Sequence, residues 1–210
     1  SGMEVEPFLE SARHRDRVRA AYGFTEKHIV VGKIARLFEL KGHEFVIAAA
    51  GDILSRVPEI RFLFVGDGTL QEKYKAEIAR RGLSEYFLFA GLVPPTEIPA
   101  MLSAMDIVVH TSLREGLARV LPQALLAGKP VVSFDVDGAR EVVVDGETGF
   151  LLPPKDGQAL VASILTLAAD PGMRERFGNA GQGRFAEQFD HRSMTARIRE
   201  IYREILERKS

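Results

Sequence analysis

Residues 29–68 read IVVGKIARLFELKGHEFVIAAAGDILSRVPEIRFLFVGDG, and they contain one complete β-α-β pattern. Ile29–Ala35 is a short apolar run that predicts a buried strand, and Ile60–Val65 is a second such run. Between them, Glu44–Leu54 repeats apolar residues at helical spacing. Because nearly continuous apolar strands are typical of a sheet covered on both faces, this unit predicts a parallel sheet flanked by helices.

The same alternation continues through residue 152. The predicted helices are Leu70–Arg81, Thr96–Ala104, Val120–Ala127 and Ala139–Val144, and the predicted strands are Tyr86–Phe89, Ile107–His110, Pro130–Phe134 and Gly149–Leu152. Residues 1–27 are polar and irregular, with a charged helical stretch near Ser11–Tyr22, and are interpreted as a lead-in. We therefore predict an α/β fold: a Rossmann-like, doubly wound parallel sheet with extra C-terminal helices.

The last third of the chain, Gln158–Arg208, is predicted to be helical. Its final helix, within residues 191–210, carries Met194, Ile198, Ile201 and Ile205 as an apolar stripe with charges on the other face. This stripe either packs on its own domain or reaches across to a partner domain.

Composition excludes several classes of function. The 210 residues are 46% apolar and 27% charged, with a formal net charge of -1, so there is no general attraction to nucleic acid. Cysteine is absent, which excludes disulfides and thiolate metal sites. No apolar run reaches the roughly 18–20 residues needed to cross a bilayer, and no signal peptide is visible, so we expect a cytoplasmic protein.

The loop after the first predicted strand carries two cations, Arg36 and Lys41, followed by Gly42. Ligands of doubly wound sheets bind at the carboxyl ends of the strands, and Arg and Lys five residues apart can converge on one phosphate there. The alternative is a solvated loop with two unrelated charges.

The richest segment runs from His110 to Gln123, between a predicted strand and a predicted helix. Backbone N–H groups at a helix start suit phosphate, Glu115 could accept hydrogen bonds from sugar hydroxyls, and Gly116 would let a ligand approach the backbone. Gln123, about two helical turns further along, could line the same cleft. Alternatively, Glu115 is a helix-terminus charge and Gln123 a surface residue.

Other motifs are weaker. Gly66-Asp67-Gly68-Thr69-Leu70-Gln71 begins like a dinucleotide fingerprint, but Gln71 replaces the third glycine. Asp135 and Asp137 match an Asp-x-Asp metal signature, yet loop or capping roles are favoured because no other acidic cluster is near in the sequence. His43 and His110 have no companions at ligand spacing, so no metal site is predicted.

Taken together, these segments resemble the C-terminal domain of GT-B glycosyltransferases of family 4, the glycosyl transferases group 1. Val31–Gly42 is similar to the family's Gly-Arg-Leu…Glu-Lys-Gly loop, with Ala35 in place of its glycine. Gly128-Lys129-Pro130-Val131-Val132 and Asp145–Leu152 also fit, as do Phe64–Gly68, Phe89–Gly91 and the entering segment Ser1–Phe8.

The resemblance implies roles for individual residues. Arg36 and Lys41 would hold a donor diphosphate, while Glu115, the first acid of the family's Glu-x7-Glu motif, would contact the donor sugar. Backbone groups of Gly116, Leu117 and Ala118 would face the sugar and phosphates, and Leu92 or Val93 would meet the base. Gln123 stands where the motif's second Glu holds the ribose. The same loops add Gly66, Ser112, Arg119 and Val120 to the predicted binding residues.

By this resemblance, the chain is the donor-binding part of a retaining enzyme that transfers a hexose from a nucleoside diphosphate sugar, most plausibly of UDP or GDP. No metal or separate cofactor is implied. Residues 28–190 would bind the donor, and a missing N-terminal domain would bind the acceptor, so this fragment alone would not turn over. Peripheral membrane association of the full-length enzyme stays open. The alternatives are a non-catalytic nucleotide-binding module and a nucleotide-sugar epimerase; the missing third glycine argues against a nicotinamide enzyme.

Overall fold

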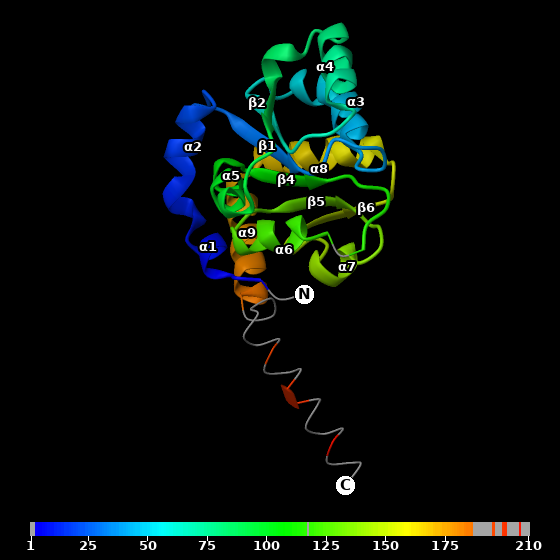
Figure 1. The fold of residues 1–210 in the computed structure, drawn as a ribbon. Coiled ribbons are helices and arrows are strands. Elements are labelled where there is room, and N and C mark those ends of the chain that lie inside the picture. Colours follow the sequence, from blue (N-terminus) through cyan, green and yellow to red (C-terminus); the bar gives the residue numbers. More distant parts are fainter. Residues whose placement is uncertain (1–2, 117, 187–194, 196–198, 201–205, 207–210) are drawn as a thin grey trace.

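The computed structural model describes residues 3–116, 118–186, 195, 199–200 and 206. Six parallel strands form one sheet in the order β3-β2-β1-β4-β5-β6 (Figure 1). They are β1 (Ile29–Ile34), β2 (Ile60–Val65), β3 (Phe87–Gly91), β4 (Ile107–His110), β5 (Val131–Phe134) and β6 (Gly149–Leu152). This order confirms the predicted doubly wound, Rossmann-like class.

Nine α-helices lie within the described ranges. They are α1 (Glu6–Leu9), α2 (Arg15–Ala21), α3 (His43–Leu54), α4 (Gln71–Arg80), α5 (Ile98–Ala104), α6 (Val120–Leu126), α7 (Ala139–Val142), α8 (Gly157–Ala169) and α9 (Pro171–Phe185). Short 3-10 helices, η1 (Ser11–His14), η2 (Ser84–Tyr86) and η3 (Pro95–Glu97), precede α2, β3 and α5. The elements predicted within residues 29–152 thus agree with the structure to within a few residues.

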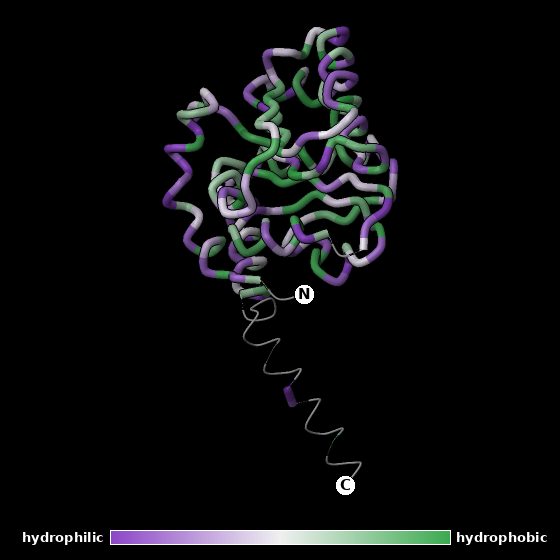
Figure 2. The backbone as a smooth tube through the Cα atoms, viewed as in Figure 1, coloured by the Kyte–Doolittle hydropathy of each residue, from purple (hydrophilic) through white to green (hydrophobic). Residues whose placement is uncertain are grey.

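Two hydrophobic cores lie on the two faces of the sheet. Side chains alternate along β1, so Val31 joins the core under α3, α4 and α8, whereas Val30 joins the core under α5 and α6. The strands form the apolar centre of the molecule and polar residues gather on the outer helices, as Figure 2 shows. Burial on both faces explains why the strands read as continuous apolar runs.

The lead-in is a packed part of the fold. Phe8 and Val18 are buried in the core under α5 and α6. The Arg19 side chain, 2% exposed, donates to the carbonyl oxygens of Thr25, His28 and Ala104 and pairs with Asp106. These bonds fix α2 against the C-terminal end of α5, whose last carbonyl groups would otherwise lack partners.

The start of the last third is helical, as predicted, as far as the structure describes it. From Gln158 onward it holds α8 and α9, separated at Asp170. Asp170 accepts from the Met173 N–H at 2.8 Å and caps α9, while Pro171 cannot continue α8. Likewise α7 ends at Val142, because Val143 is extended. The stripe of Met194, Ile198, Ile201 and Ile205 lies outside the described residues.

The strand order reverses between β1 and β4, which are neighbours in the sheet although two strands separate them in sequence. In doubly wound sheets, ligands bind outside the carboxyl ends of the strands at such a point, because the connections leave in opposite directions. The loops that follow β1 and β4 are therefore where a ligand site is expected.

Candidate functional site

The loops after β1 and β4 are joined edge to edge. The Leu113 N–H donates to the Leu40 carbonyl at 2.8 Å, and the Thr111 hydroxyl donates to the Gly42 carbonyl at 2.7 Å. A Cβ at residue 42 would lie 1.8 Å from the Thr111 carbonyl oxygen, and Gly42 has a φ of +73°. Only glycine fits at this crossing, so Gly42 brings the two loops together.

The predicted residues Lys41 and Glu115 meet across this junction. Lys41 Nζ lies 2.5 Å from Glu115 Oε1, and the Ser112 hydroxyl donates to the same oxygen at 3.2 Å. Both charged side chains are about three-quarters buried, at 27% and 22% exposure. Residues 74 apart in sequence thus form one ion pair at the switch point.

The charge on Glu115 is strongly favoured. The His110 imidazole and the Lys41 ammonium hold the pKa of Glu115 at about 2, although burial opposes them. Burial in turn lowers the pKa of His110, so at neutral pH Lys41 supplies the positive charge. Glu115 is therefore ionised over the physiological range, and both of its oxygens act as hydrogen-bond acceptors.

His110 lies between Ser133 and Glu115. The Ser133 hydroxyl donates to the Phe134 carbonyl at 2.9 Å, and its oxygen lies 3.2 Å from His110 Nδ1. His110 Nε2 faces Glu115 Oε1 at 3.9 Å and has no hydrogen-bond partner within 3.5 Å among the described residues. His110 therefore sits directly behind the Glu115 carboxylate.

A buried lysine lies under the same junction. Lys33, in β1, is 1% exposed and donates to Thr111 Oγ1 at 3.1 Å. Burial lowers the pKa of Lys33 to about 7, although the Glu44 and Glu115 carboxylates oppose that shift. The sequence analysis missed Lys33; the available signal was a charged residue inside an otherwise apolar strand.

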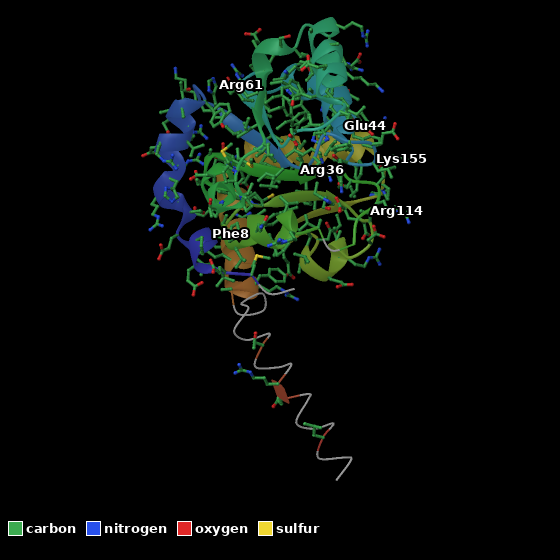
Figure 3. The ribbon with its side chains drawn as sticks, in the orientation of Figure 1. Phe8, Arg36, Glu44, Arg61, Arg114 and Lys155 are labelled. Carbon is green, nitrogen blue, oxygen red and sulfur yellow. The ribbon has the colours of Figure 1, made fainter. Side chains whose placement is uncertain are left out.

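The two predicted cations do not converge in this structure. The Arg36 guanidinium stacks over the Phe38 ring at 4.2 Å instead of facing Lys41. Arg36 also lines an open hollow of about 560 Å³ together with Phe38, Asp67, Gly68, Thr69, Gln71 and Glu72. Figure 3 labels Arg36, Glu44 and Arg114 on the right half of the view, toward which the arrows of β4, β5 and β6 point in Figure 1. Arg36 is thus near the junction but paired separately from Lys41.

The glycines after β2 have a packing reason. A Cβ at Gly66 would lie 2.2 Å from the Ala35 carbonyl oxygen, and one at Gly68 would lie 2.4 Å from that of Leu37. The Leu37 N–H also donates to the Asp67 carbonyl at 2.7 Å. These glycines let the β2 loop pack on the β1 loop, which accounts for them without a dinucleotide.

The segment between Glu115 and Gln123 is not one helix, contrary to the spacing argument. α6 begins only at Val120, and the described residues 111–116 and 118–119 lie outside any helix. At the start of α6, Pro122 has no N–H and the Leu121 N–H bonds the Ala118 carbonyl at 3.1 Å. The phosphate site expected at this helix start stays a prediction.

Gln123 faces a different neighbourhood from Glu115. With Arg119 it lines a hollow of about 360 Å³, whose other walls are Met3, Glu4, Pro7, Phe8, Pro95, Thr96 and Pro99. No hydrogen bond joins Gln123 to Glu115 among the described residues. The lead-in and the loop after β3 therefore form the surroundings of Gln123.

The remaining predicted residues vary in accessibility. Gly116 has open space where a Cβ would be, so nothing in its packing demands glycine. Leu92, in the loop after β3, is 74% exposed, and Val93 is half-buried against the core. Ala118 is buried and Val120 half-buried, while Leu117 lies outside the described residues.

The acidic pair Asp135 and Asp137 has the loop roles that the sequence favoured. Asp135 pairs with Arg140, and Asp137 Oδ2 accepts from the Glu115 N–H at 2.5 Å. His43 is buried between Phe64 and Tyr74, and burial together with the Lys33 charge lowers its pKa to about 2. Within the described ranges, no three His, Asp or Glu side chains group as metal ligands.

A Rossmann-like sheet of this strand order defines a doubly wound α/β protein. The chain belongs to the glycosyl transferases group 1 family, whose model matches residues 14–184. No helix among the described residues is long and apolar enough to span a bilayer.

Relatives agree with this family. The chain is 29% identical over 196 residues to alpha-D-kanosaminyltransferase of Streptomyces kanamyceticus, a match to 93% of this chain and 50% of that protein. It is 29% identical over 207 residues to a GDP-mannose-dependent alpha-(1-6)-phosphatidylinositol monomannoside mannosyltransferase of Mycolicibacterium smegmatis, covering 95% of this chain and 54% of the relative. The chain thus spans about half the length of these curated relatives.

The fold also matches solved structures. The crystal structure of Anabaena HepE in complex with UDP superposes with a TM-score of 0.89 at 29% identity, over 97% of this chain and 56% of that one. Further structures of the same protein hold UDP with glucose, and UDP-glucose.

Proposed function

We propose that this chain is the C-terminal, donor-binding domain of a retaining GT-B glycosyltransferase of family 4, which transfers a hexose from a nucleoside diphosphate sugar. Residues 28–190 would bind the donor, residues 1–27 would lead in from an N-terminal acceptor domain, and residues 191–210 would reach back toward it. Alone, the domain would bind nucleotide without turnover.

The observation that carries this proposal is the Lys41–Glu115 pair at the switch point, in a chain of the glycosyl transferases group 1 family. A cation suits the phosphates of such a donor, and an ionised carboxylate suits the hydroxyls of its sugar. Both groups come from strand-end loops that hydrogen bonds join to each other. A ligand that carries phosphate and hydroxyl groups together would have one partner for each at this junction.

The chemistry of sugar transfer explains why a cation is needed there. The donor loses a nucleoside diphosphate while positive character grows at the anomeric carbon, so negative charge develops on the departing phosphate. Lys41, and Arg36 once it leaves Phe38, would stabilise that charge in a partly buried site where water screens it weakly. Glu115 would hold the sugar in place, and the acceptor would come from the other domain.

The identity of the nucleotide is the open part of the proposal. The Anabaena relative binds UDP, and the Mycolicibacterium relative is named for GDP-mannose, so UDP and GDP are the nucleotides to test first. The exposed Leu92 and the Gln123 hollow flank the loop after β3, and we assign base and ribose to this side of the site.

A thermal-shift panel tests the proposal directly. The 210-residue chain would be heated with UDP, GDP, ADP, NAD and the corresponding nucleotide sugars, each with and without EDTA. We expect the melting temperature to rise with one nucleoside diphosphate and its sugars, to stay unchanged with NAD, and to be insensitive to EDTA. Stabilisation by NAD alone, or a shift that vanishes with EDTA and returns with Mg²⁺, would contradict the proposal.

A further inference from the structure

Asp137 occupies a left-handed backbone conformation, which few residue types adopt readily. It has a φ of +48°, in a turn that the Ala139 N–H closes onto the Val136 carbonyl at 3.0 Å. Glycine, asparagine and aspartate dominate turns with a positive φ at the first central residue, and glycine adopts that φ without steric cost. Backbone strain at a non-glycine residue persists where its surroundings hold it in place, and such residues cluster at functional sites.

The carboxylate of Asp137 makes a contact that glycine could not. Its Oδ2 accepts from the backbone N–H of Glu115 at 2.5 Å, which links the loop after β5 to the loop after β4. The neighbouring Asp135 is engaged differently, because both of its oxygens face the Arg140 guanidinium. Asp135 thus forms an ion pair within its own loop, whereas Asp137 accepts a hydrogen bond from the neighbouring loop at Glu115.

Besides the contacts of the Glu115 side chain with Lys41 and Ser112, backbone hydrogen bonds hold the described part of this segment at its two ends. The Leu113 N–H bonds the Leu40 carbonyl at 2.8 Å on one side, and the Leu121 N–H bonds the Ala118 carbonyl at 3.1 Å on the other. Of the backbone N–H groups of residues 114–116, that of Glu115 alone makes a hydrogen bond within the described part of the chain. A charge-assisted bond at this point therefore fixes the backbone from which the Glu115 side chain extends.

We propose that Asp137 is a positioning residue, which fixes the Glu115 backbone so that its carboxylate faces the donor sugar. The effect on sugar binding rests on the proposed function, whereas the hydrogen bond between Asp137 and the Glu115 amide does not. Since Asp137 is negative, it disfavours a phosphate beside the Glu115 amide and leaves that place to the neutral sugar. Loss of Asp137 should weaken binding of a nucleotide sugar while sparing the nucleoside diphosphate alone.

The test uses three variants of the 210-residue chain. Asp137→Gly removes the carboxylate and suits the positive φ, so the turn should survive. Asp137→Asn keeps an acceptor oxygen and tolerates the same backbone conformation. Asp135→Asn is the matched control, since it removes a charge from the same loop without touching Glu115.

Amide hydrogen exchange, measured residue by residue by NMR, tests the hydrogen bond between the Glu115 N–H and Asp137 without any ligand. In Asp137→Gly, the Glu115 amide should exchange roughly tenfold to a hundredfold faster, the range for losing a hydrogen bond to a charged group. Asp137→Asn should fall close to the parent, and Asp135→Asn should match it. Unchanged exchange at Glu115 in Asp137→Gly, or equal acceleration in Asp135→Asn, would overturn the inference.

Calorimetry with UDP and UDP-glucose, or with the GDP pair if the thermal-shift panel selects it, then reads the consequence. We expect Asp137→Gly to bind the nucleotide sugar about tenfold more weakly and the diphosphate within about twofold of the parent. Equal losses for both ligands would overturn the sugar-positioning role. If the parent binds no nucleotide at all, the proposed function fails, while the exchange rate of the Glu115 amide still decides the contact.

Discussion

Replacing Glu115 by glutamine should change the binding of the diphosphate and of the sugar, the two parts of the proposed donor, in opposite directions. In the free domain, Glu115 neutralises Lys41 at 2.5 Å, so a diphosphate that uses Lys41 must compete with this carboxylate. Glu115→Gln keeps the size of the side chain but removes the charge. We expect this variant to bind the nucleoside diphosphate more tightly and the nucleotide sugar no better than the parent.

The magnitude follows from the charges at the junction. One unit charge about 6 Å from another interacts by roughly 3 kcal/mol at an effective dielectric constant of about 20. Because Glu115 keeps 22% exposure and salt screens the pair, we take about 1–2 kcal/mol, or roughly fivefold to thirtyfold tighter diphosphate binding. The sugar, in contrast, loses charge-assisted hydrogen bonds of about 1.5–3 kcal/mol each, which cancels or reverses that gain.

Isothermal titration calorimetry of parent and variant with both ligands measures the difference. Glu77→Gln is the matched control, because Glu77 also pairs with cations, Arg80 and Arg81, but on the outer surface of α4. The reasoning is refuted if Glu115→Gln weakens both ligands equally, or if it changes neither. Either result would mean that Glu115 does not both compete with the phosphate for Lys41 and bind the sugar.

Other substitutions test the rest of the site and the core beneath it. Arg36→Ala should weaken nucleoside diphosphate binding by roughly 1.5–3 kcal/mol, the range for hydrogen bonds to charged groups, and hardly change binding of the bare nucleoside; equal calorimetric affinities for the diphosphate would remove Arg36 from the site. Gln123→Ala should cost ribonucleotides about 1 kcal/mol, and the 2′-deoxy forms less, because one neutral hydrogen bond to the ribose is lost; equal losses would mean that Gln123 does not contact the ribose. Lys33→Met should flatten the dependence of stability on pH. The pKa of Lys33 is lowered to about 7 in the fold, so the unfolded chain binds more protons above that pH. The parent's free energy of unfolding should therefore rise by roughly 2–4 kcal/mol more than the variant's as pH rises from 7 to 10. Denaturant titrations at the two pH values check this, and equal slopes for the two proteins would show that Lys33 does not lose its charge.

Local pattern was enough for most elements of this fold. Ile60–Val65 was predicted with the bounds that β2 has, since an apolar run flanked by Pro58 and Gly66 leaves little freedom in where a strand begins and ends. Periodicity also predicted helical structure from Gln158 onward, but not where one helix ends and the next begins, because Asp170 and Pro171 set that boundary.

The amino-acid sequence by itself determined the doubly wound class and the strand-end loops that carry Lys41 and Glu115, because hydrophobic periodicity and the punctuation by glycine and proline act over a few residues. Only the tertiary structure decided which of those groups meet. It pairs Lys41 with Glu115, turns Arg36 onto Phe38, and brings Asp137 to the Glu115 amide. The Lys41–Glu115 and Asp137–Glu115 contacts join residues 74 and 22 positions apart, and they depend on how the strands are ordered in the sheet, which a pattern of nearby residues does not encode.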